Sequence, residues 1–244
     1  MGAFRDPQDK NKTTKDMRVL LYIFVVLSFG AIFLSFTGEK MDAGYHGIDV
    51  SRHQRNIDWE QVSKDKNIQF VYIKATEGKT YIDPKYKYNI KEARKNKFKV
   101  GAYHYFRTTS SAHGQFENFK KTARKADQDL IPIVDVEERK NWTRSQFQDS
   151  LKVFIRLVKE HYGKAPMIYS VNSFYNANCA PEFNNYHAMI GRYNDDPTKH
   201  PTVKGKGTYT IWQFSEKGKI KGIKEPVDLN RFNPKYTIDD LLLK

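Results

Sequence analysis

Eight short segments with the pattern of β-strands recur between residues 46 and 232, and this repetition limits the possible folds more than any other feature. Each segment is rich in β-branched or aromatic residues and is bounded by turn-forming residues. A chain with this many strands has to bury them in a sheet or a barrel. The segments are residues 46–51, 68–78, 98–106, 130–138, 165–172, 186–194, 207–215 and 225–232.

Helical patterns fill several gaps between the early strands. Asp83, which precedes a proline, is typical of a helix cap. Residues 116–126 carry an apolar face that includes Ala126, and residues 143–162 carry another that ends at Gly163. The helical signal fades toward the C-terminus. The alternation predicts an α/β fold, an irregular TIM-barrel-like (β/α) barrel whose later strands have few helices between them.

One uncharged apolar run, residues 19–37, precedes the strands and is long enough to span a membrane as a helix. Basic residues crowd its N-terminal flank, which places the N-terminus in the cytoplasm and the rest of the chain outside it. We expect a single-pass membrane anchor, and cleavage as a secretory signal is the alternative. The expected parts are a cytoplasmic basic tail (1–18), a transmembrane signal-anchor (19–37), a linker (38–45) and the barrel domain (46–244).

The formal net charge is +14, to which residues 1–40 contribute only +2, with six Lys and Arg against four Asp and Glu. The exported part is therefore strongly basic, which suits an acidic cell-wall polymer or a lipid surface, whereas export argues against nucleic acid. The lysines are scattered over predicted helix faces, so a merely solvated basic surface is the alternative. The single cysteine, Cys179, cannot form an intramolecular disulfide, and we expect it to be a buried apolar residue.

Four acidic residues lie at or near the ends of predicted strands: Asp49 in the first, Asp135 and Glu137 in the fourth, and Asp228 in the last. In a (β/α) barrel the site lies where strands end and loops begin. Residues two apart on a strand face the same side, so we expect Asp135 and Glu137 to share the barrel mouth. Two carboxyls so close push their pKa values apart, which leaves one protonated and one ionised.

One protonated and one ionised carboxyl is the equipment for hydrolysis of a glycosidic bond. The structural alternative is that the acids cap the following helix or pair with Lys74, Arg139 or Arg192. The D-x-E pattern also recurs by chance. The placement of all four acids at strand ends favours the catalytic interpretation.

Aromatic residues in the segments that end strands add a second signal. Sugar rings pack their apolar C–H faces on aromatic rings and need polar partners at their edges. We single out Trp212, next to the polar Gln213, although a core position is the simpler explanation for most of these residues singly. His104 has no partner histidine at helical spacing, so we expect no metal. The aromatic residues are Tyr103, Tyr105, Tyr169, Tyr193 and Trp212.

Seven motifs occur in order along the chain: GIDVS, YIKATEG, GAYHYF, PIVDVEE, IYS, IWQFS and VDLNRF. Together, over about residues 45–232, they closely resemble glycoside hydrolase family 25, the Chalaropsis-type lysozymes. Each motif alone is weak evidence, but seven in order with barrel-like spacing form a specific signal. The resemblance implies an irregular β/α barrel that cleaves the β-1,4 bond after N-acetylmuramic acid in bacterial peptidoglycan without a cofactor.

Carried over to this chain, the resemblance implies that Glu137 is the general acid/base. Asp135 would be the ionised partner that supports the 2-acetamido group of the substrate during neighbouring-group attack. Asp49 and Asp228 match the two further acids of the family site. The family has tyrosine after its WQ pair where this chain has Phe214, the membrane segment is an addition to the family pattern, and we expect a monomer. The implied sugar groove contains Tyr103, Tyr169, Trp212 and Gln213.

Two rival functions stay open. A chitinase-like hydrolase of amino-sugar polymers also carries D-x-E on a barrel strand, and activity on chitin oligomers but not on peptidoglycan would identify it. A non-catalytic wall-binding barrel would usually have lost an acid, whereas all four are present here. The sequence also leaves open whether the reaction is substrate-assisted with retention or proceeds by direct attack of water.

Overall fold

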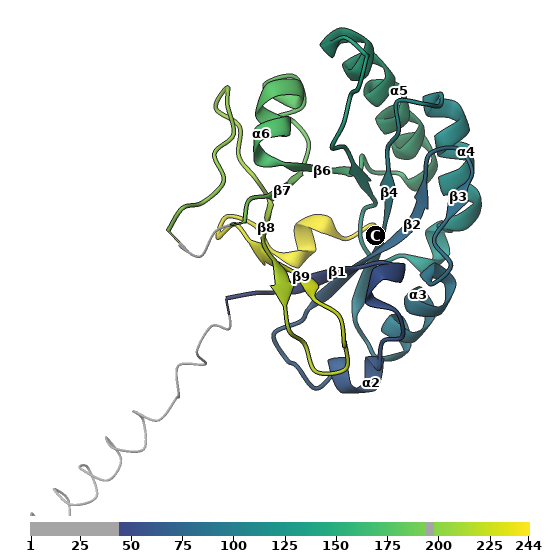
Figure 1. The fold of residues 1–244 in the computed structure, drawn as a ribbon, viewed down its shortest axis with the longest axis vertical. Helices are drawn as coiled ribbons and strands as arrows, with labels where there is room; N and C mark the ends of the chain where they lie inside the picture. The colour runs from purple at the N-terminus through teal and green to yellow at the C-terminus, as the bar shows by residue number, and fades with distance from the viewer. Residues whose placement is uncertain (1–43, 194–197) are drawn as a thin grey trace, which may run out of the picture. The chain divides into compact units, whose positions relative to one another are not determined.

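Strand pairing closes the sheet into a barrel. The computed structural model describes residues 44–193 and 198–244, in which nine strands form one sheet. These are β1 (Gly47–Val50), β2 (Phe70–Glu77), β3 (Tyr81–Ile82), β4 (Lys99–Tyr105), β5 (Ile133–Asp135), β6 (Met167–Val171), β7 (Ala188–Gly191), β8 (Ile211–Gly218) and β9 (Val227–Phe232). β1 pairs with both β2 and β9, so the ring closes, and β3 lies outside it as a short partner of β2 (Figure 1).

The direction of the last strand explains why the barrel becomes irregular. The ring is parallel from β1 through β2 and β4 to β8, but β9 is antiparallel to both of its neighbours. Parallel neighbours need a crossover connection, whereas antiparallel neighbours do not. The chain therefore passes from β8 to β9 without a helix. The predicted eight strands and the fading of helices toward the C-terminus are confirmed.

The helices pack unevenly around the barrel. Figure 1 shows α3, α4 and α5 side by side along one flank, while the flank formed by β7 to β9 has no comparable helix. The α-helices are α2 (Trp59–Val62), α3 (Tyr86–Lys95), α4 (Ala112–Thr122), α5 (Arg144–Tyr162) and α6 (Asn172–Phe174). Shorter turns are the 3₁₀ segments η1 (Arg52–Gln54), η2 (Lys125–Asp127) and η4 (Ile238–Leu241), and the π segment η3 (Tyr175–Cys179).

The sequence of α5 specifies both of its ends. The Thr143 hydroxyl accepts a hydrogen bond from the backbone of Gln146 at 3.2 Å, and the Gln146 side chain accepts one from the backbone of Thr143 at 2.8 Å. This capping box satisfies two donors that a helix start leaves unpaired. At the other end Gly163 has φ +90°, a conformation that glycine adopts without strain. The predicted helix over residues 143–162 is confirmed.

Two local predictions are wrong. Asp83 does not cap a helix that starts at the following proline: α3 begins at Tyr86, and the Asp83 carboxylate accepts hydrogen bonds from the backbone of Lys85 and of Arg52. It therefore ties the start of α3 to the loop after β1. Ala126 is exposed, because α4 ends at Thr122 and Ala126 belongs to the separate turn η2.

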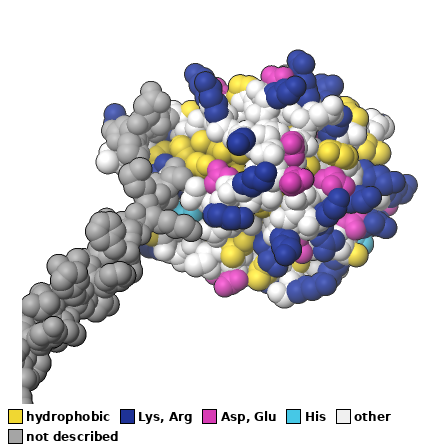
Figure 2. Space-filling view, turned by 90° about the horizontal axis from the view of Figure 1, so that it is seen from below, with side chains coloured by type: hydrophobic (Ala, Val, Ile, Leu, Met, Phe, Trp, Pro, Cys, Tyr) yellow, Lys and Arg dark blue, Asp and Glu magenta, His cyan; other side chains and the backbone are white. Residues whose placement is uncertain are grey.

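The predicted tail and membrane segment lie outside the described residues. Among residues 44–193 and 198–244 there is no helix whose length and apolar character would allow it to cross a membrane. Figure 2 shows Lys and Arg side chains over much of one face, with Asp and Glu side chains among them. The surface is thus basic but mixed on this face.

Candidate active site

A polar cavity of about 220 Å³ lies at the end of the barrel where the parallel strands finish. Its lining is unusual for a protein of net charge +14, because five carboxyl groups converge on it. These five are Asp49, Asp135, Glu137, Glu216 and Asp228. All four acids predicted from strand ends are therefore brought together. The other lining residues are Tyr72, Tyr103, Ile133, Tyr169, Met189, Tyr193 and Gln213.

Asp135 and Glu137 form the first carboxyl pair, at the end of β5. Both line the cavity, whereas Val136 between them is fully buried, as the alternation of a strand requires. The two carboxyls lie close enough that the charge of Glu137 acts on Asp135. Burial and the nearby charge of Glu137 raise the pKa of Asp135 well above its usual range. Burial also raises the pKa of Glu137, although the interaction with Asp135 and the charges of Lys74 and Arg107 oppose this rise.

This pair holds one proton near neutral pH, because two adjacent carboxyls in a buried site do not both ionise. Asp135 is only 6% exposed, whereas Glu137 is half-buried. Removal from water disfavours the charged form most at the deeper group. The family resemblance implies that Glu137 is protonated and Asp135 ionised, but the residues of the cavity by themselves favour the reverse order.

Asp49 and Asp228 form the second pair, as direct neighbours across the antiparallel strands β1 and β9. Asn230 and Gln213 each donate a hydrogen bond to Asp49 Oδ2 at 2.9 Å. Burial raises the pKa of Asp49, and these two hydrogen bonds partly offset that rise. Burial and the charge of Asp49 raise the pKa of Asp228 to about 9. Asp228 is therefore the protonated member of this pair at neutral pH.

Gln213 connects the second pair to two tyrosines at the rim. Its Oε1 accepts hydrogen bonds from the hydroxyls of Tyr169 at 2.7 Å and Tyr193 at 2.6 Å. This contact needs a glycine at position 191, because a Cβ there would lie 2.8 Å from the Tyr169 hydroxyl oxygen. Tyr193 is 43% exposed, so it presents a ring to whatever enters the cavity.

The bases considered as structural partners of the acids bind elsewhere. Lys74 pairs with Glu77 at 2.8 Å. Arg139 donates to the backbone of Trp142, and Arg192 donates to the backbone of His200. Within the described part of the chain, none of the four predicted acids forms an ion pair. The carboxyls are thus not neutralised by the fold, which favours a chemical role over a structural one.

Two other reactive side chains have structural surroundings. His104 is fully buried between Thr76 Oγ1, at 2.7 Å from Nδ1, and Gln115 Oε1, at 3.1 Å from Nε2. Burial lowers its pKa to about 4, so it stays neutral. Cys179 is buried, and burial raises the pKa of its thiol to about 12. Residues 44–193 and 198–244 contain no cluster of three or more His, Cys, Asp or Glu side chains arranged to hold a metal ion.

Comparison with known proteins identifies the family. The sequence model of "Glycosyl hydrolases family 25" matches residues 48–223, which is most of the barrel. The chain belongs to glycosyl hydrolase family 25. It is therefore a glycoside hydrolase, and the resemblance seen in the motifs is confirmed at the level of the family.

Relatives of this family 25 chain include characterised and uncharacterised proteins. It is 37% identical over 208 residues to "Uncharacterized protein YegX" of Escherichia coli, covering 83% of this chain and 74% of the relative. It is 30% identical over 211 residues to "Lysozyme M1" of Streptomyces globisporus, covering 80% and 70%. A solved family 25 glycosyl hydrolase from Bacillus anthracis superimposes with a TM-score of 0.71 at 30% identity, covering 79% of this chain and 92% of that one.

The structure corrects the expectation for Trp212. Gln213 lines the cavity, and the next residue along a strand faces the opposite side, so Trp212 points out of the barrel. Trp212 is only 1% exposed, its indole N–H donates to the backbone of Arg192, and its ring contacts Phe214 and Arg231. It has no surface left for a sugar. The other three residues expected in the sugar groove, Tyr103, Tyr169 and Gln213, line the cavity.

Sequence reasoning missed four lining residues: Tyr72, Ile133, Met189 and Glu216. Ile133 was detectable in principle, since it lies two residues before Asp135. Tyr72 is the strand partner of Asp49 between β1 and β2, and the sequence does not reveal this pairing. Glu216 was missed because the predicted strand ended at residue 215, whereas β8 runs on to Gly218. Met189 gave no signal beyond an apolar residue in a strand.

Proposed function

We propose that the chain is a lysozyme-type muramidase, which hydrolyses the β-1,4 glycosidic bond between N-acetylmuramic acid and N-acetylglucosamine in bacterial peptidoglycan. The observation that carries the proposal is the Asp135–Glu137 pair, two carboxyls that line one cavity and form no ion pair with a base among the described residues. The names of relatives support the substrate class. They include "Autolytic lysozyme" of Clostridium acetobutylicum and "Lysozyme M1" of Streptomyces globisporus.

In this proposal Glu137 is the general acid/base. It is the more accessible member of the pair, so it is the one that can meet the glycosidic oxygen of a bound glycan. It gives its proton to that oxygen as the bond to C1 breaks, and later takes a proton from the water that completes the reaction. The first step needs the proton to lie on Glu137 when the substrate is bound, and that step leaves Glu137 ionised, as the second step requires.

Asp135 is the proposed support for the 2-acetamido group. Its Oδ1 is buried without a hydrogen-bond donor among the described residues. An acetamido N–H placed there would donate to it and stabilise the charged form of Asp135, which moves the shared proton to Glu137. The charged Asp135 then opposes the positive charge that develops at C1 and on the acetamido nitrogen. The acetamido oxygen attacks C1, water opens the resulting ring, and the product retains its configuration.

The Glu137→Gln variant tests this assignment. We expect a folded protein whose turnover of peptidoglycan is lower by roughly 10²–10⁴-fold, because it has lost general acid catalysis. Glu117→Gln on the exposed surface of α4 is the matched control and should be unaffected. Turnover of folded Glu137→Gln within a few-fold of the wild type would refute the role of Glu137.

The anomer released first by the wild-type protein tests the mechanism in the same assay. Retention is expected, whereas an inverted anomer would indicate direct attack of water with Asp135 as the base. Cleavage of chitin oligomers without cleavage of peptidoglycan would reassign the substrate to another amino-sugar polymer.

We further propose that the catalytic domain acts outside the cytoplasm, anchored by residues 19–37. The support is the apolar run with basic residues on its N-terminal flank. The full-length protein should fractionate with membranes, and protease added outside the cytoplasmic membrane should digest the barrel domain. A soluble mature chain that begins near residue 38 would show cleavage of a secretory signal instead.

A further inference from the structure

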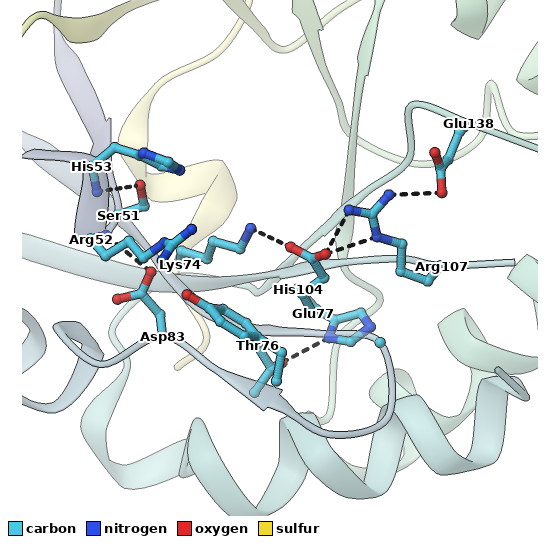
Figure 3. A network of polar contacts seen from close by, with 12 residues as sticks. Ser51, Arg52, His53, Lys74, Thr76, Glu77, Asp83, His104, Arg107 and Glu138 are labelled. Atoms are coloured by element: carbon cyan, nitrogen blue, oxygen red, sulfur yellow. Dashed lines mark hydrogen bonds and ion pairs between the residues drawn. The ribbon is translucent and has the colours of Figure 1, made fainter. Parts of the chain in front are cut away.

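A chain of four charged side chains runs beside the Asp135–Glu137 pair. Lys74 Nζ contacts Glu77 Oε2 at 2.8 Å, and Glu77 Oε1 contacts Arg107 Nη2 at 2.6 Å. Arg107 also donates from Nε to the same Glu77 oxygen at 2.9 Å, and its Nη1 contacts Glu138 Oε1 at 2.8 Å. Figure 3 shows this chain passing from Lys74 through Glu77 and Arg107 to Glu138.

An aromatic ring fixes the two cations further. Lys74 Nζ lies 5.1 Å from the centre of the Tyr105 ring, and the Arg107 guanidinium carbon lies 4.4 Å from it. Both distances fall within the range of cation–π attraction. The side chain of Lys74 is only 14% exposed, and that of Arg107 is 30% exposed. With this little exposure, the Lys74 ammonium depends on contacts with the protein more than on water.

The same chain of charged side chains is connected to the backbone segments that carry the acid pair. Glu138 follows Glu137 directly in the sequence, and Tyr105 is the strand partner of Asp135 between β4 and β5. The backbone N–H of Phe106 donates to the carbonyl of Asp135 at 2.8 Å. The charged chain therefore joins β2, β4 and β5 at the point where the acid pair leaves the sheet.

Lys74 and Arg107 are positive charges that act on the pair. The charge of Lys74 lowers the pKa of both Asp135 and Glu137, and that of Arg107 lowers the pKa of Glu137. The other titratable groups that face the pair are acids or phenols; burial raises the pKa of each of these phenols, so they stay neutral. These groups are Asp49, Tyr72, Tyr103, Tyr105, Tyr169, Tyr193, Glu216 and Asp228.

Lys74 nevertheless forms no ion pair with Asp135 or Glu137, since its ammonium is held by Glu77. A lysine has a flexible four-carbon stem and readily takes a new partner when its own is removed. An ion pair between Lys74 and either member of the pair would keep that carboxyl ionised and deplete the proton that the acid has to deliver. The position of the Lys74 ammonium therefore affects whether the acid pair keeps the proton that it has to deliver.

We propose that Glu77 and Arg107 are positioning residues, which hold the Lys74 ammonium beside the acid pair and prevent it from forming an ion pair with either carboxyl. The inference rests on the proposed function, because it assumes that Glu137 is the proton donor. It assigns a task to three charged residues that do not line the cavity.

The pH dependence of kcat/KM in the full-length protein tests the proposal. In Glu77→Gln, Lys74 moves onto the acid pair and the pair loses its proton at lower pH. The alkaline limb should shift down by about 0.5–1 pH unit, a 3–10-fold loss on that side. In Lys74→Met the positive charge is gone, and the limb should shift up by a similar amount. The two substitutions should therefore shift the alkaline limb in opposite directions.

A double variant shows whether Glu77 acts through Lys74. In the Lys74→Met background, Glu77→Gln should shift the limb much less than it does alone. The matched control is Lys120–Glu117 on α4, which has the same 2.8 Å distance, the same spacing and a cation–π contact to Phe116 at 5.4 Å. Lys120→Met and Glu117→Gln should leave the profile unchanged.

Two results would overturn the inference. One is a lower melting temperature in Glu77→Gln and Lys74→Met with both alkaline limbs unmoved, which would make the chain of charges purely structural. The other is a shift of the same sign in both variants. If Glu77→Gln does not fold, Lys74→Met alone decides, since an unmoved limb contradicts the proposal. Failure of the proposed function is separate, because it appears as full activity of Glu137→Gln.

Discussion

At the scale of single residues, the Asp49–Asp228 pair shows how the acidic cavity lowers the stability of the folded state. Asp228 has a pKa raised to about 9, because burial and the charge of Asp49 disfavour its ionised form. An aspartate in the unfolded chain titrates near 3.9. Between these two values the folded state binds more protons than the unfolded state, so the contribution of Asp228 to stability falls as pH rises through this window.

Asp228→Asn should therefore stabilise the protein at neutral and alkaline pH. The amide can still donate a hydrogen bond to Asp49 but adds no second charge. We expect a gain of about 0.5–2 kcal/mol in the free energy of unfolding at pH 8, as is common when a strained active-site group is replaced. The gain should shrink toward pH 4, where the unfolded chain also begins to bind the proton. Urea unfolding at pH 4, 6 and 8 measures it, and a gain that does not change with pH would contradict the raised pKa.

At the scale of elements, strand periodicity accounts for both the successes and the error of sequence reasoning. Asp135 and Glu137 were placed together because they lie two residues apart on one strand, and both line the cavity. Trp212 and Gln213 were also placed together, but adjacent strand residues face opposite sides, and only Gln213 lines the cavity. The alternation of side chains along a strand therefore places Asp135 and Glu137 on one side and Trp212 and Gln213 on opposite sides.

Contacts between distant elements were beyond the reach of the sequence. The hydrogen bonds of Gln213 join β8 to β6 and to β1, and no local pattern announces such partners. The requirement for Gly191 arises from the hydroxyl of Tyr169 on the neighbouring strand. β3 was missed because it is two residues long, too short for a periodic signal. Periodicity thus predicts which residues face inward, whereas the partners they meet depend on the closed barrel.

At the scale of the whole molecule, the acidic cavity sits in a strongly basic chain. One surface groove concentrates that charge over α3 and the turn η2. Lys87, Lys91 and Lys95 are spaced four residues apart, so they lie on one face of α3. Arg124 at the edge of this groove already pairs with Asp127, and Arg94 with Asp129. Lys95 also contacts Glu92, at 3.7 Å, and its side chain is 74% exposed. Lys87 and Lys91, with Lys95 at the end of the row, are therefore the part of the groove best able to attract an anionic wall polymer.

The charge of this groove predicts that binding to anionic cell walls depends on salt. Binding of the inactive Glu137→Gln protein to cell walls that carry anionic polymers should weaken strongly between low salt and about 0.5 M salt, where such charges are screened. Replacing Lys87, Lys91 and Lys95 together by Gln should reduce binding several-fold at low salt. In the catalytically active protein the same change should leave turnover of a short neutral glycan unaltered. Cosedimentation with cell walls measures the binding. The control is a variant in which the exposed Lys64, Lys219 and Lys221 are replaced by Gln in the same way.

An equal loss of binding in both triple variants would attribute the effect to net charge alone. No loss in either variant would mean that the lysines of the groove are simply solvated.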